Sequence, residues 1–299
     1  MDKTLRMRVG VQKSGRLTEN SLDLLHRCGL VYSRAPDQLI CYGENMPLDI
    51  LLVRDDDIPG LVIEGSCQLG IAGLNVVEEQ RLERLSRGEP GGLEVLRELG
   101  VGQCRLCIAA PEGVAYEGPA TLQGKKVATS YPFLLRDYLA RNNVEAEVVV
   151  LSGAVEIAPK LGKADFICDL VSTGVTLAAN HLREVETILE SQSVLLRTTM
   201  EVPTVSEEWI QRLIRRLDGV LQVRESKYIM LHAPRAAMKE ISDLLPGSEA
   251  PTVMPLEGRP DKVAVHAVCP EDVFWETLEA LQAAGATSLL VLPLEKMLP

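Results

Sequence analysis

Over residues 1–90 the hydrophobic pattern switches repeatedly between the period of a strand and the period of a helix. Apolar or alternating runs predict strands over 6–12, 49–53 and 69–72. Helical spacing predicts a helix over 18–28, and Asp57 and Asn75 are expected to cap the helices that follow the two later strands. Strands that alternate with helices through short connections are typical of an α/β fold with parallel strands.

A second α/β unit begins near residue 102, after a polar, Gly-rich stretch over 87–92 that predicts a surface loop. Strands are expected over 104–109, 126–128, 147–151 and 166–171. A helix is expected over 131–139, and loop and helix over 152–161. Two successive α/β lobes predict a cleft between them, where small ligands usually bind.

Residues 225–299 follow a different order. The pattern predicts strands over 228–233, 252–256, 263–268 and 288–292, and helices over 235–245 and 271–284. This βαββαβ order indicates a small ferredoxin-like domain of the kind that often binds an effector or a partner subunit.

Composition narrows the classes of protein. The chain has 299 residues, 46% of them hydrophobic, and mean hydropathy is +0.08. No apolar run approaches the roughly 20 residues that span a bilayer, and the first residues do not resemble a signal peptide, so we expect a cytoplasmic protein without membrane contact. A net charge of -11 argues against nucleic-acid binding. The seven scattered cysteines are typical of reduced thiols.

The most informative segment is 169–176, where an apolar run ends in a small hydroxyl-rich loop before an apparent helix. Ser172, Thr173 and Thr176 offer hydroxyl donors, and Gly174 lets backbone N–H groups approach an anion. A helix start adds free N–H groups and a positive dipole end. With Asp169 placed for sugar hydroxyls, the loop predicts a site for a phosphorylated ribose. The alternative is an ordinary helix cap and turn.

Cations gather in a second candidate site. Lys13 and Arg16 share a predicted strand-to-helix loop, where a planar guanidinium and a mobile ammonium could hold a departing pyrophosphate. Arg54 ends the next strand and could contact a nucleotide, and the acids at 55–57 could bind magnesium. The alternatives are solvated loop charges and, for Asp57, a helix cap.

Other candidates are weaker. Cys104 and Cys107 lie three apart in a strand-like run and face opposite sides, which argues against a zinc or redox pair. The four histidines show no ligand spacing. Trp209 and Trp275 are expected in hydrophobic cores.

Taken together, the motifs resemble the ATP phosphoribosyltransferase family, the first enzymes of histidine biosynthesis, over essentially the whole chain. The resemblance lies in segments 12–17, 54–60, 128–132, 156–159, 162–165, 168–177, 225–234 and 288–293. The last two resemble the regulatory domain of the long form. The resemblance implies a two-lobed, periplasmic-binding-protein-like core, with lobe I over 1–102 and 185–224, lobe II over 103–184, and a regulatory domain over 225–299.

The resemblance also implies a reaction in which adenine N1 of ATP attacks C1 of phosphoribosyl pyrophosphate, releasing pyrophosphate, with Mg²⁺ accompanying the phosphates. Phosphoribosyl pyrophosphate would contact Glu156, Asp169, Leu170, Val171, Ser172, Thr173, Gly174, Val175 and Thr176. ATP would contact Arg16, Arg54, Gly73, Leu74 and Asn75. Lys13 and Arg16 would be the catalytic pair, and no protein side chain is assigned to a metal. Catalysis would come mainly from positioning and electrostatics.

The family further implies a homo-oligomer, a hexamer built from dimers, and inhibition by histidine and AMP. His232 and Thr252 are the expected effector contacts in the C-terminal domain. Two rival classes remain open. A two-lobed solute-binding module would lack chemistry, and a hydroxymethylbilane-synthase-like enzyme would carry a covalent cofactor on a cysteine, for which Cys269 is the candidate in the third domain.

Overall fold

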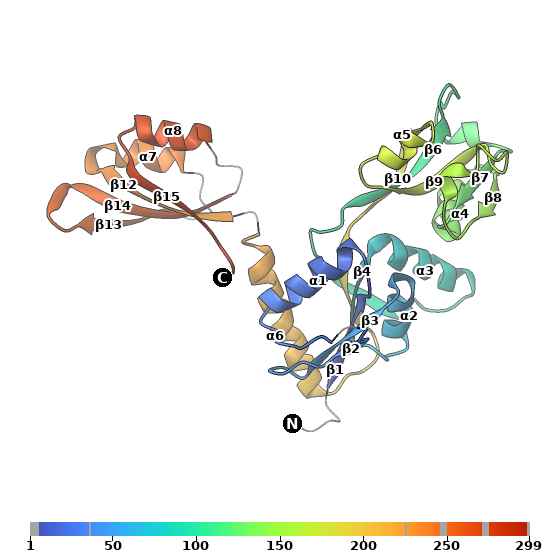
Figure 1. The fold of residues 1–299 in the computed structure, drawn as a ribbon, viewed down its shortest axis with the longest axis horizontal. Helices are drawn as coiled ribbons and strands as arrows, with labels where there is room; N and C mark the ends of the chain where they lie inside the picture. Colours follow the sequence, from blue (N-terminus) through green and yellow to red (C-terminus); the bar gives the residue numbers. More distant parts are fainter. Residues whose placement is uncertain (1–5, 36, 225, 246–249, 271–274, 298–299) are drawn as a thin grey trace. The chain divides into compact units, whose positions relative to one another are not determined.

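The computed structural model describes residues 6–35, 37–224, 226–245, 250–270 and 275–297, and of Arg16 and Pro270 it describes only the backbone. Three sheets organise the chain, two in α/β lobes and one in the C-terminal domain (Figure 1). The chain divides into two compact units. One holds 1–26 and 30–209, and the other holds 27–29 and 210–299.

The first lobe contains a six-stranded sheet in the order β2-β3-β1-β4-β11-β5. Its strands are β1 (Met7–Gln12), β2 (Ile40–Cys41), β3 (Leu48–Val53), β4 (Leu69–Gly73), β5 (Leu93–Glu98) and β11 (Ser193–Thr198). Its helices are α1 (Arg16–Arg27), η2 (Asp55–Asp57), α2 (Ile58–Ile63) and α3 (Leu74–Ser86). The central strands β3, β1 and β4 run parallel, as predicted, so their carboxyl ends meet at one edge.

Close packing of α2 on this sheet depends on a glycine. Ile58 and Val62 of α2 are fully buried, and a Cβ on Gly70 of β4 would come within 2.8 Å of a methyl of each. The absent side chain therefore lets the helix lie directly on the strand.

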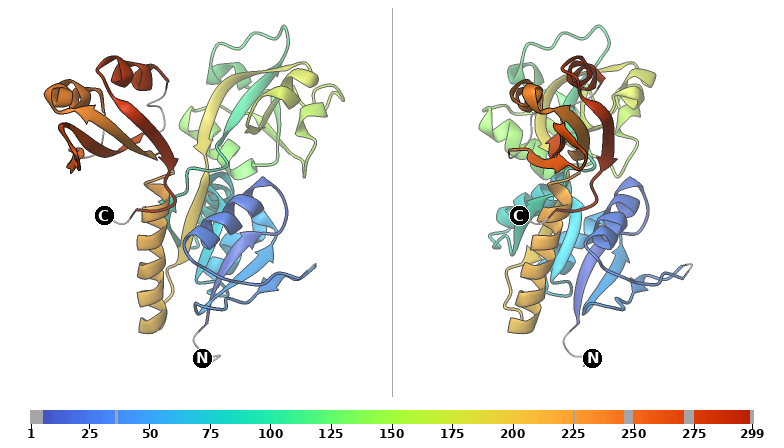
Figure 2. Two further views of the ribbon diagram at one scale, coloured as in Figure 1. Left: turned by 60° about the vertical axis from the view of Figure 1, so that its left-hand side comes forward. Right: turned by 90° about the vertical axis from the view of Figure 1, so that its left-hand side faces the viewer.

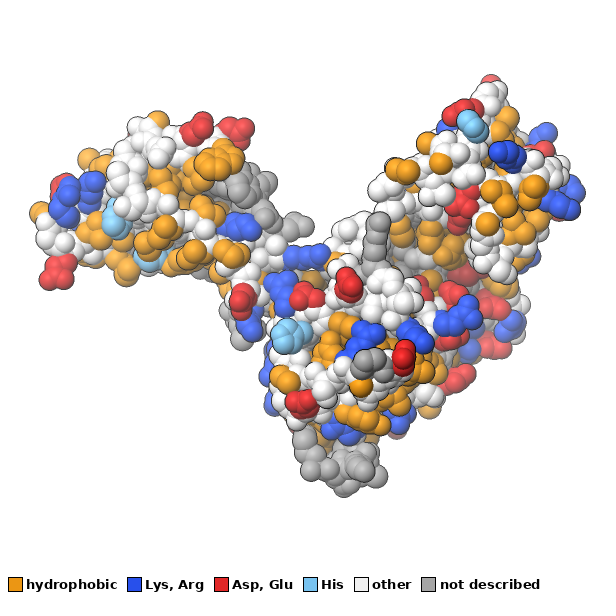
Figure 3. All heavy atoms as spheres, viewed as in Figure 1, with side chains coloured by type: hydrophobic (Ala, Val, Ile, Leu, Met, Phe, Trp, Pro, Cys, Tyr) orange, Lys and Arg blue, Asp and Glu red, His pale blue; other side chains and the backbone are white. Residues whose placement is uncertain are grey.

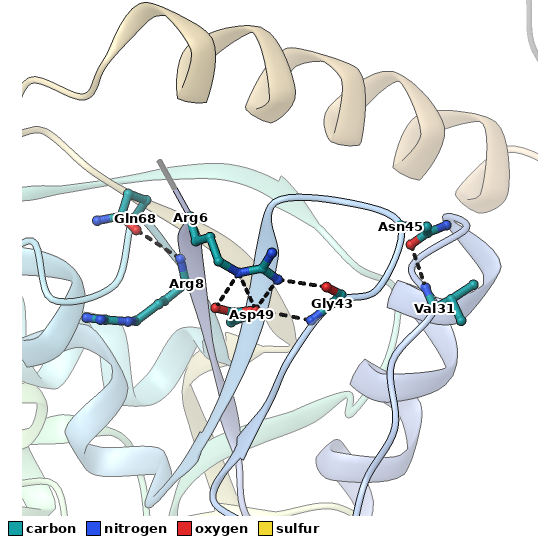
Figure 4. A network of polar contacts seen from close by, with 7 residues as sticks. All are labelled: Arg6, Arg8, Val31, Gly43, Asn45, Asp49 and Gln68. Atoms are coloured by element: carbon teal, nitrogen blue, oxygen red, sulfur yellow. Dashed lines mark hydrogen bonds and ion pairs between the residues drawn. The ribbon is translucent and has the colours of Figure 1, made fainter. Parts of the chain in front are cut away.

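A polar network lies at the amino end of β1 and β3 (Figure 4). The Arg6 guanidinium donates to both carboxylate oxygens of Asp49, at 3.0 and 2.9 Å from Nε, and to the carbonyl of Gly43. Asp49 in turn accepts the N–H of Gly43 at 3.1 Å. A Cβ at Gly43 would lie 2.2 Å from the Leu48 carbonyl oxygen, so only glycine fits this turn.

The second lobe contains a five-stranded sheet in the order β10-β6-β9-β7-β8. Its strands are β6 (Cys104–Pro111), β7 (Lys126–Thr129), β8 (Glu147–Val150), β9 (Phe166–Val171) and β10 (Leu182–Ser191). Its helices are η3 (Pro119–Leu122), α4 (Pro132–Arg141), η4 (Val155–Ile157) and α5 (Val175–Ala179). Buried clusters cover both faces of the sheet. Phe166 belongs to one and Ile167 to the other, which explains why β9 is apolar except for Asp169.

The long antiparallel strand β10 corrects one predicted boundary. Residues 185–191, expected in the first lobe, pair with β6 in the second. The chain returns to the first sheet only at β11, which begins at Ser193. Charged and apolar residues are mixed along this strand without a strict period, so only the pairing decides where the strand belongs.

The C-terminal domain is ferredoxin-like, as predicted. Its sheet order β13-β14-β12-β15 joins β12 (Ser226–Pro234), β13 (Thr252–Leu256), β14 (Arg259–Pro270) and β15 (Thr287–Pro293). Its helices are η5 (Arg235–Ala237), α7 (Met238–Leu244) and α8 (Trp275–Ala283). Both α7 and α8 lie on one face of the sheet (Figures 1 and 2), where alternate residues of β12 and β14 form the core. The preceding helix α6 (Thr204–Leu221) crosses the division between the units.

Neither of the two tryptophans that were expected in hydrophobic cores is fully buried. Trp275, expected in a core, begins α8 and is 73% exposed. The predicted helix start at 271–274 lies outside the described residues. Trp209 is half-buried. Helical spacing alone could not separate a core tryptophan from one at the solvent-facing start of a helix.

Candidate functional site

Three predicted loops of the first lobe meet at the carboxyl edge of its parallel strands. Gln12 pairs with Val53 at the ends of β1 and β3, and the Lys13 N–H donates to the Val53 carbonyl at 2.7 Å. This bond places Lys13 beside the turn that starts at Arg54. Both side chains are exposed. Arg16 is the first residue of α1 rather than part of the loop, and its side chain lies outside the described atoms.

The predicted helix caps of this edge are wrong. Asp57 is already in helical conformation and makes no capping hydrogen bond, because the 3-10 turn η2 precedes α2 directly. Asn75 is the second residue of α3, which Gly73 precedes. Its side chain and N–H are engaged with Ser191, since the N–H donates to Ser191 Oγ at 3.0 Å and Oδ1 accepts from that hydroxyl at 2.9 Å. The Leu74 N–H donates to the Gln192 carbonyl at 2.9 Å, so these two N–H groups are not free for an anion.

In the second lobe, the segment that ends β9 lines a pocket of about 240 Å³. The lining residues are Glu156, Asp169, Leu170, Val171, Ser172, Thr173, Gly174, Thr176 and Leu177. All the residues expected to hold phosphoribosyl pyrophosphate are therefore gathered in one place, except Val175, which is 70% exposed beside the pocket. The pocket combines two carboxylates with three hydroxyls.

The hydroxyl loop is open to solvent and has the predicted turn. Gly174 has φ +78°, a left-handed conformation that glycine adopts without strain. Ser172, Thr173 and Thr176 are exposed, and within the described part of the chain their hydroxyls make no hydrogen bond. The following helix α5 has only five residues, so its dipole is smaller than the sequence suggested. Anion binding here would rest on the hydroxyls and the loop N–H groups.

The two carboxylates of the pocket influence each other. Burial and, to a smaller extent, the negative charge of Glu156 raise the pKa of Asp169 to about 6. The Leu170 N–H, which donates to Asp169 Oδ1 at 2.8 Å, opposes this rise. A carboxylate that is costly to ionise in the free protein gains most from a positively charged ligand or transition state.

Arg105 on β6 was missed by the sequence analysis. Its guanidinium forms a bidentate ion pair with Glu184, with both N–O distances at 2.6 Å, and donates to the Ser172 carbonyl at 3.4 Å. It thus supports the backbone of the hydroxyl loop from the neighbouring strand. Because Arg105 lies far from the loop in sequence, only the β6–β9 pairing reveals this contact.

A hydrogen bond joins the two groups of candidate residues. Asn75 Nδ2 donates to the Tyr131 hydroxyl, 3.1 Å away, across the two lobes. Burial raises the pKa of Tyr131, and the negative charges of Asp169, Asp56 and Asp55 raise it further. Carboxylates of both lobes therefore raise the pKa of the same phenol, so the two candidate regions lie close together. Burial also raises the pKa of Asp55 to about 6, and its Oδ1 has no hydrogen-bond partner within the described part of the chain.

In the C-terminal domain, His232 and Thr252 lie on the sheet face opposite the helices but not on adjacent strands. His232 pairs with Ala264 of β14, whereas Thr252 pairs with His266 of the same strand. His266, like the other histidines, shows no ligand spacing in the sequence. Its Nδ1 is hydrogen-bonded to the Tyr228 hydroxyl, and its buried Nε2 has no hydrogen-bond partner among the residues that the structure describes.

The cysteines are free thiols, as predicted. Cys107 is buried and Cys104 is half-buried, and both belong to β6. Cys269 is buried, and burial raises the pKa of its thiol. A buried, protonated thiol is a poor nucleophile, which argues against a covalently attached cofactor there. No helix of the described residues is long and apolar enough to cross a membrane.

Comparisons with known proteins agree with this architecture. Residues 54–219 match the family described as ATP phosphoribosyltransferase, and residues 224–296 match the HisG C-terminal domain. The ATP phosphoribosyl transferase (HisG:HisZ) complex from Thermotoga maritima has a chain with 22% identity and a TM-score of 0.58, covering 71% of this chain and 98% of that one. The alkanesulfonate-binding protein SsuA from Xanthomonas axonopodis pv. citri shows 17% identity over 73% of this chain and 74% of its own, with a TM-score of 0.44.

The fold therefore defines a two-lobed α/β enzyme core followed by a ferredoxin-like domain. Because the first family match spans more than half of the chain, the chain belongs to the ATP phosphoribosyltransferase family, and the C-terminal match makes it the long form. It is a transferase of histidine biosynthesis, at the first step of the pathway. This result decides against the solute-binding module and the hydroxymethylbilane-synthase-like enzyme.

Proposed function

We propose that the protein joins adenine N1 of ATP to C1 of phosphoribosyl pyrophosphate, giving N1-(5-phosphoribosyl)-ATP and pyrophosphate. The observation that carries this proposal is the pocket of about 240 Å³, which combines the carboxylates of Glu156 and Asp169 with the hydroxyl loop 172–176. The loop would hold the 5-phosphate, and the carboxylates would hold the ribose hydroxyls. Such a pocket fits a sugar phosphate better than a neutral ligand.

The charges of the two lobes suit the two ends of the breaking bond. The carboxylates lie where positive charge would develop on the ribose ring as the bond to pyrophosphate breaks. The exposed cations Lys13 and Arg54 follow strands of the other lobe, where the leaving pyrophosphate and the ATP phosphates would lie. No general base is needed, because adenine N1 carries a free lone pair. Rate acceleration would come from positioning and preorganised charge.

Mg²⁺ would enter with the phosphates of the substrates. The described residues contain no group of three or more His, Cys, Asp and Glu side chains arranged to hold a metal ion. Mg²⁺ is commonly held by one or two carboxylates together with substrate phosphates and water. Glu156 and Asp169 in the pocket are carboxylates of this kind.

We propose further that the enzyme is a homo-oligomer, a hexamer built from dimers, inhibited by histidine and AMP. Figure 3 shows hydrophobic side chains gathered along the sheet side of the C-terminal domain. Met254, Leu290 and Leu292 on this face are 45%, 48% and 50% exposed. Exposed apolar side chains of this kind favour contact with a second copy. Histidine would bind to this domain, with His232 and Thr252 as candidate contacts.

An ultraviolet assay tests the reaction. The protein is mixed with ATP, phosphoribosyl pyrophosphate, Mg²⁺ and pyrophosphatase, with and without histidine, and N1-substituted adenine is followed by its absorbance. Activity suppressed by histidine supports both the reaction and its regulation. Activity without suppression supports the reaction and contradicts histidine inhibition. Inactivity of folded protein contradicts the proposed reaction.

Replacing Thr173 with alanine is expected to raise the Kd for phosphoribosyl pyrophosphate about tenfold, because a charge-assisted hydrogen bond to phosphate is lost. The Kd for ATP should change less than about twofold, since ATP would lie toward the other lobe. Isothermal titration with each substrate measures both. The control is Ser152→Ala, which removes an exposed hydroxyl of the same lobe outside the pocket lining. Equal weakening for both substrates contradicts the loop assignment.

A further inference from the structure

Helix α4 of the second lobe begins without a cap of its own. It starts at Pro132, and Tyr131 before it makes no capping hydrogen bond with its side chain. The N–H groups of Phe133 and Leu134 donate instead to Glu79, one to each carboxylate oxygen and both at 2.8 Å. Since Glu79 belongs to α3 of the first lobe, the cap of this helix comes from the opposite lobe.

Two further side chains of α3 reach the second lobe. Asn75 donates to the Tyr131 hydroxyl, and Leu82 packs against the buried cluster that contains Leu134. Residues 75, 79 and 82 are spaced by four and three positions, so they lie along one face of α3. Along this face Asn75 makes a polar contact, Glu79 caps α4 and Leu82 makes an apolar contact. Together these contacts hold α3 against α4.

The two helices lead directly to the two halves of the proposed active site. Helix α3 begins directly after Gly73, and its first two residues, Leu74 and Asn75, belong to the ATP side. Helix α4 follows β7, and β7 runs parallel to β9, with Thr129 paired to Cys168 near the strand ends. The end of β9 leads into the hydroxyl loop. A rigid contact between α3 and α4 therefore sets the distance between the two loops.

We propose that Glu79 is a positioning residue, which holds the ATP-side loop and the phosphoribosyl loop in register by capping α4 across the lobes. The inference rests on the proposed function. A carboxylate suits this role, because its charge interacts favourably with the positive end of a helix dipole and its two oxygens accept two N–H groups at once. Glu79 itself touches neither substrate in this scheme.

The test compares Glu79→Ala and Glu79→Gln with Glu83→Gln. Glu83 lies one turn further along α3 and pairs with Arg87, the residue that follows this helix, so it serves as a control carboxylate with an ion pair of its own. Glu79→Ala is expected to lower kcat about tenfold, because misaligned substrates react slowly. Its Kd for phosphoribosyl pyrophosphate should stay within about twofold, since the loop of the second lobe is intact. Glu79→Gln keeps one acceptor oxygen, so its kcat should lie between those of Glu79→Ala and Glu83→Gln.

Hydrogen exchange at the amides of Phe133 and Leu134 gives a readout that does not depend on activity. Both amides should lose protection in Glu79→Ala and keep it in Glu83→Gln, at a temperature where all variants remain folded. Wild-type kcat in Glu79→Ala with lost protection overturns the positioning role and leaves the proposed function standing. Retained protection in Glu79→Ala overturns the cap itself. If the wild-type protein is inactive, the proposed function is contradicted. The hydrogen-exchange result then still shows whether Glu79 caps α4.

Discussion

Replacing Lys13 with alanine is expected to lower kcat about a hundredfold, the usual effect of removing one preorganised group from a developing negative charge. The Lys13 N–H is fixed to the Val53 carbonyl at 2.7 Å, so the backbone of the loop keeps its place when the side chain is removed. The side chain is exposed, so the unfolding midpoint should not change. Steady-state rates at saturating ATP and phosphoribosyl pyrophosphate measure the loss.

Lys125→Ala is the matched control for this variant. Lys125 is also exposed, but it precedes β7 at the amino end of that strand, away from the carboxyl edge that carries the site. It should keep the wild-type rate. Arg16→Ala should resemble Lys13→Ala, and the double variant should lose less than the product of the two losses if both cations hold one pyrophosphate. Wild-type rates in both single variants would mean that these are solvated charges.

The sequence predicted best those features that depend on neighbouring residues. The run 166–171 was expected as a strand and is β9, because residues buried on both faces give a segment that is apolar except for Asp169. The hydroxyl loop follows it directly, so its residues gather in one pocket through local chain geometry alone. The ferredoxin-like domain was predicted for a similar reason, since its strand and helix periods change in a fixed order.

Features that depend on distant pairing could not be predicted. Glu79 lies among other charged residues of α3, and nothing local separates it from Glu78 or Glu83, which form ion pairs with arginines three and four positions further along the chain. It becomes a cap only because α3 packs against α4. The same holds for Arg105, whose contact with the hydroxyl loop follows from the β6–β9 register. Asn75 was expected to cap its own helix, and it instead bonds to Ser191 far along the chain.

The raised pKa of Asp169 links activity to stability. Burial raises this pKa from 3.8 to about 6, so between these pH values the folded chain retains a proton that the unfolded chain has released. The free energy of unfolding therefore falls as pH rises through this range, and it stays lower above pH 6. A site that destabilises the free protein in this way is common where a charged group must meet a ligand.

Replacing Asp169 with asparagine should separate these two effects. The variant is expected to lose about a hundredfold in kcat, because a neutral amide cannot stabilise positive charge on the ribose. At pH 8 it should unfold at a higher temperature than the wild type, with a gain in stability of at most about 3 kcal/mol from the pKa difference. Near pH 3.5, where the aspartate is largely protonated in both states, the two proteins should unfold alike.

Activity and unfolding profiles of the two proteins, recorded over the same pH range, provide the measurement. The wild-type rate should fall as pH drops through about 6, where Asp169 takes up its proton, while the residual rate of Asp169→Asn should lack this dependence. Glu156→Gln is a useful second variant. Removing the charge of Glu156 should lower the pKa of Asp169, so the rate of this variant should begin to fall at a lower pH than the wild-type rate. An Asp169→Asn variant with wild-type kcat would show that the ribose carries no charge that this carboxylate must balance.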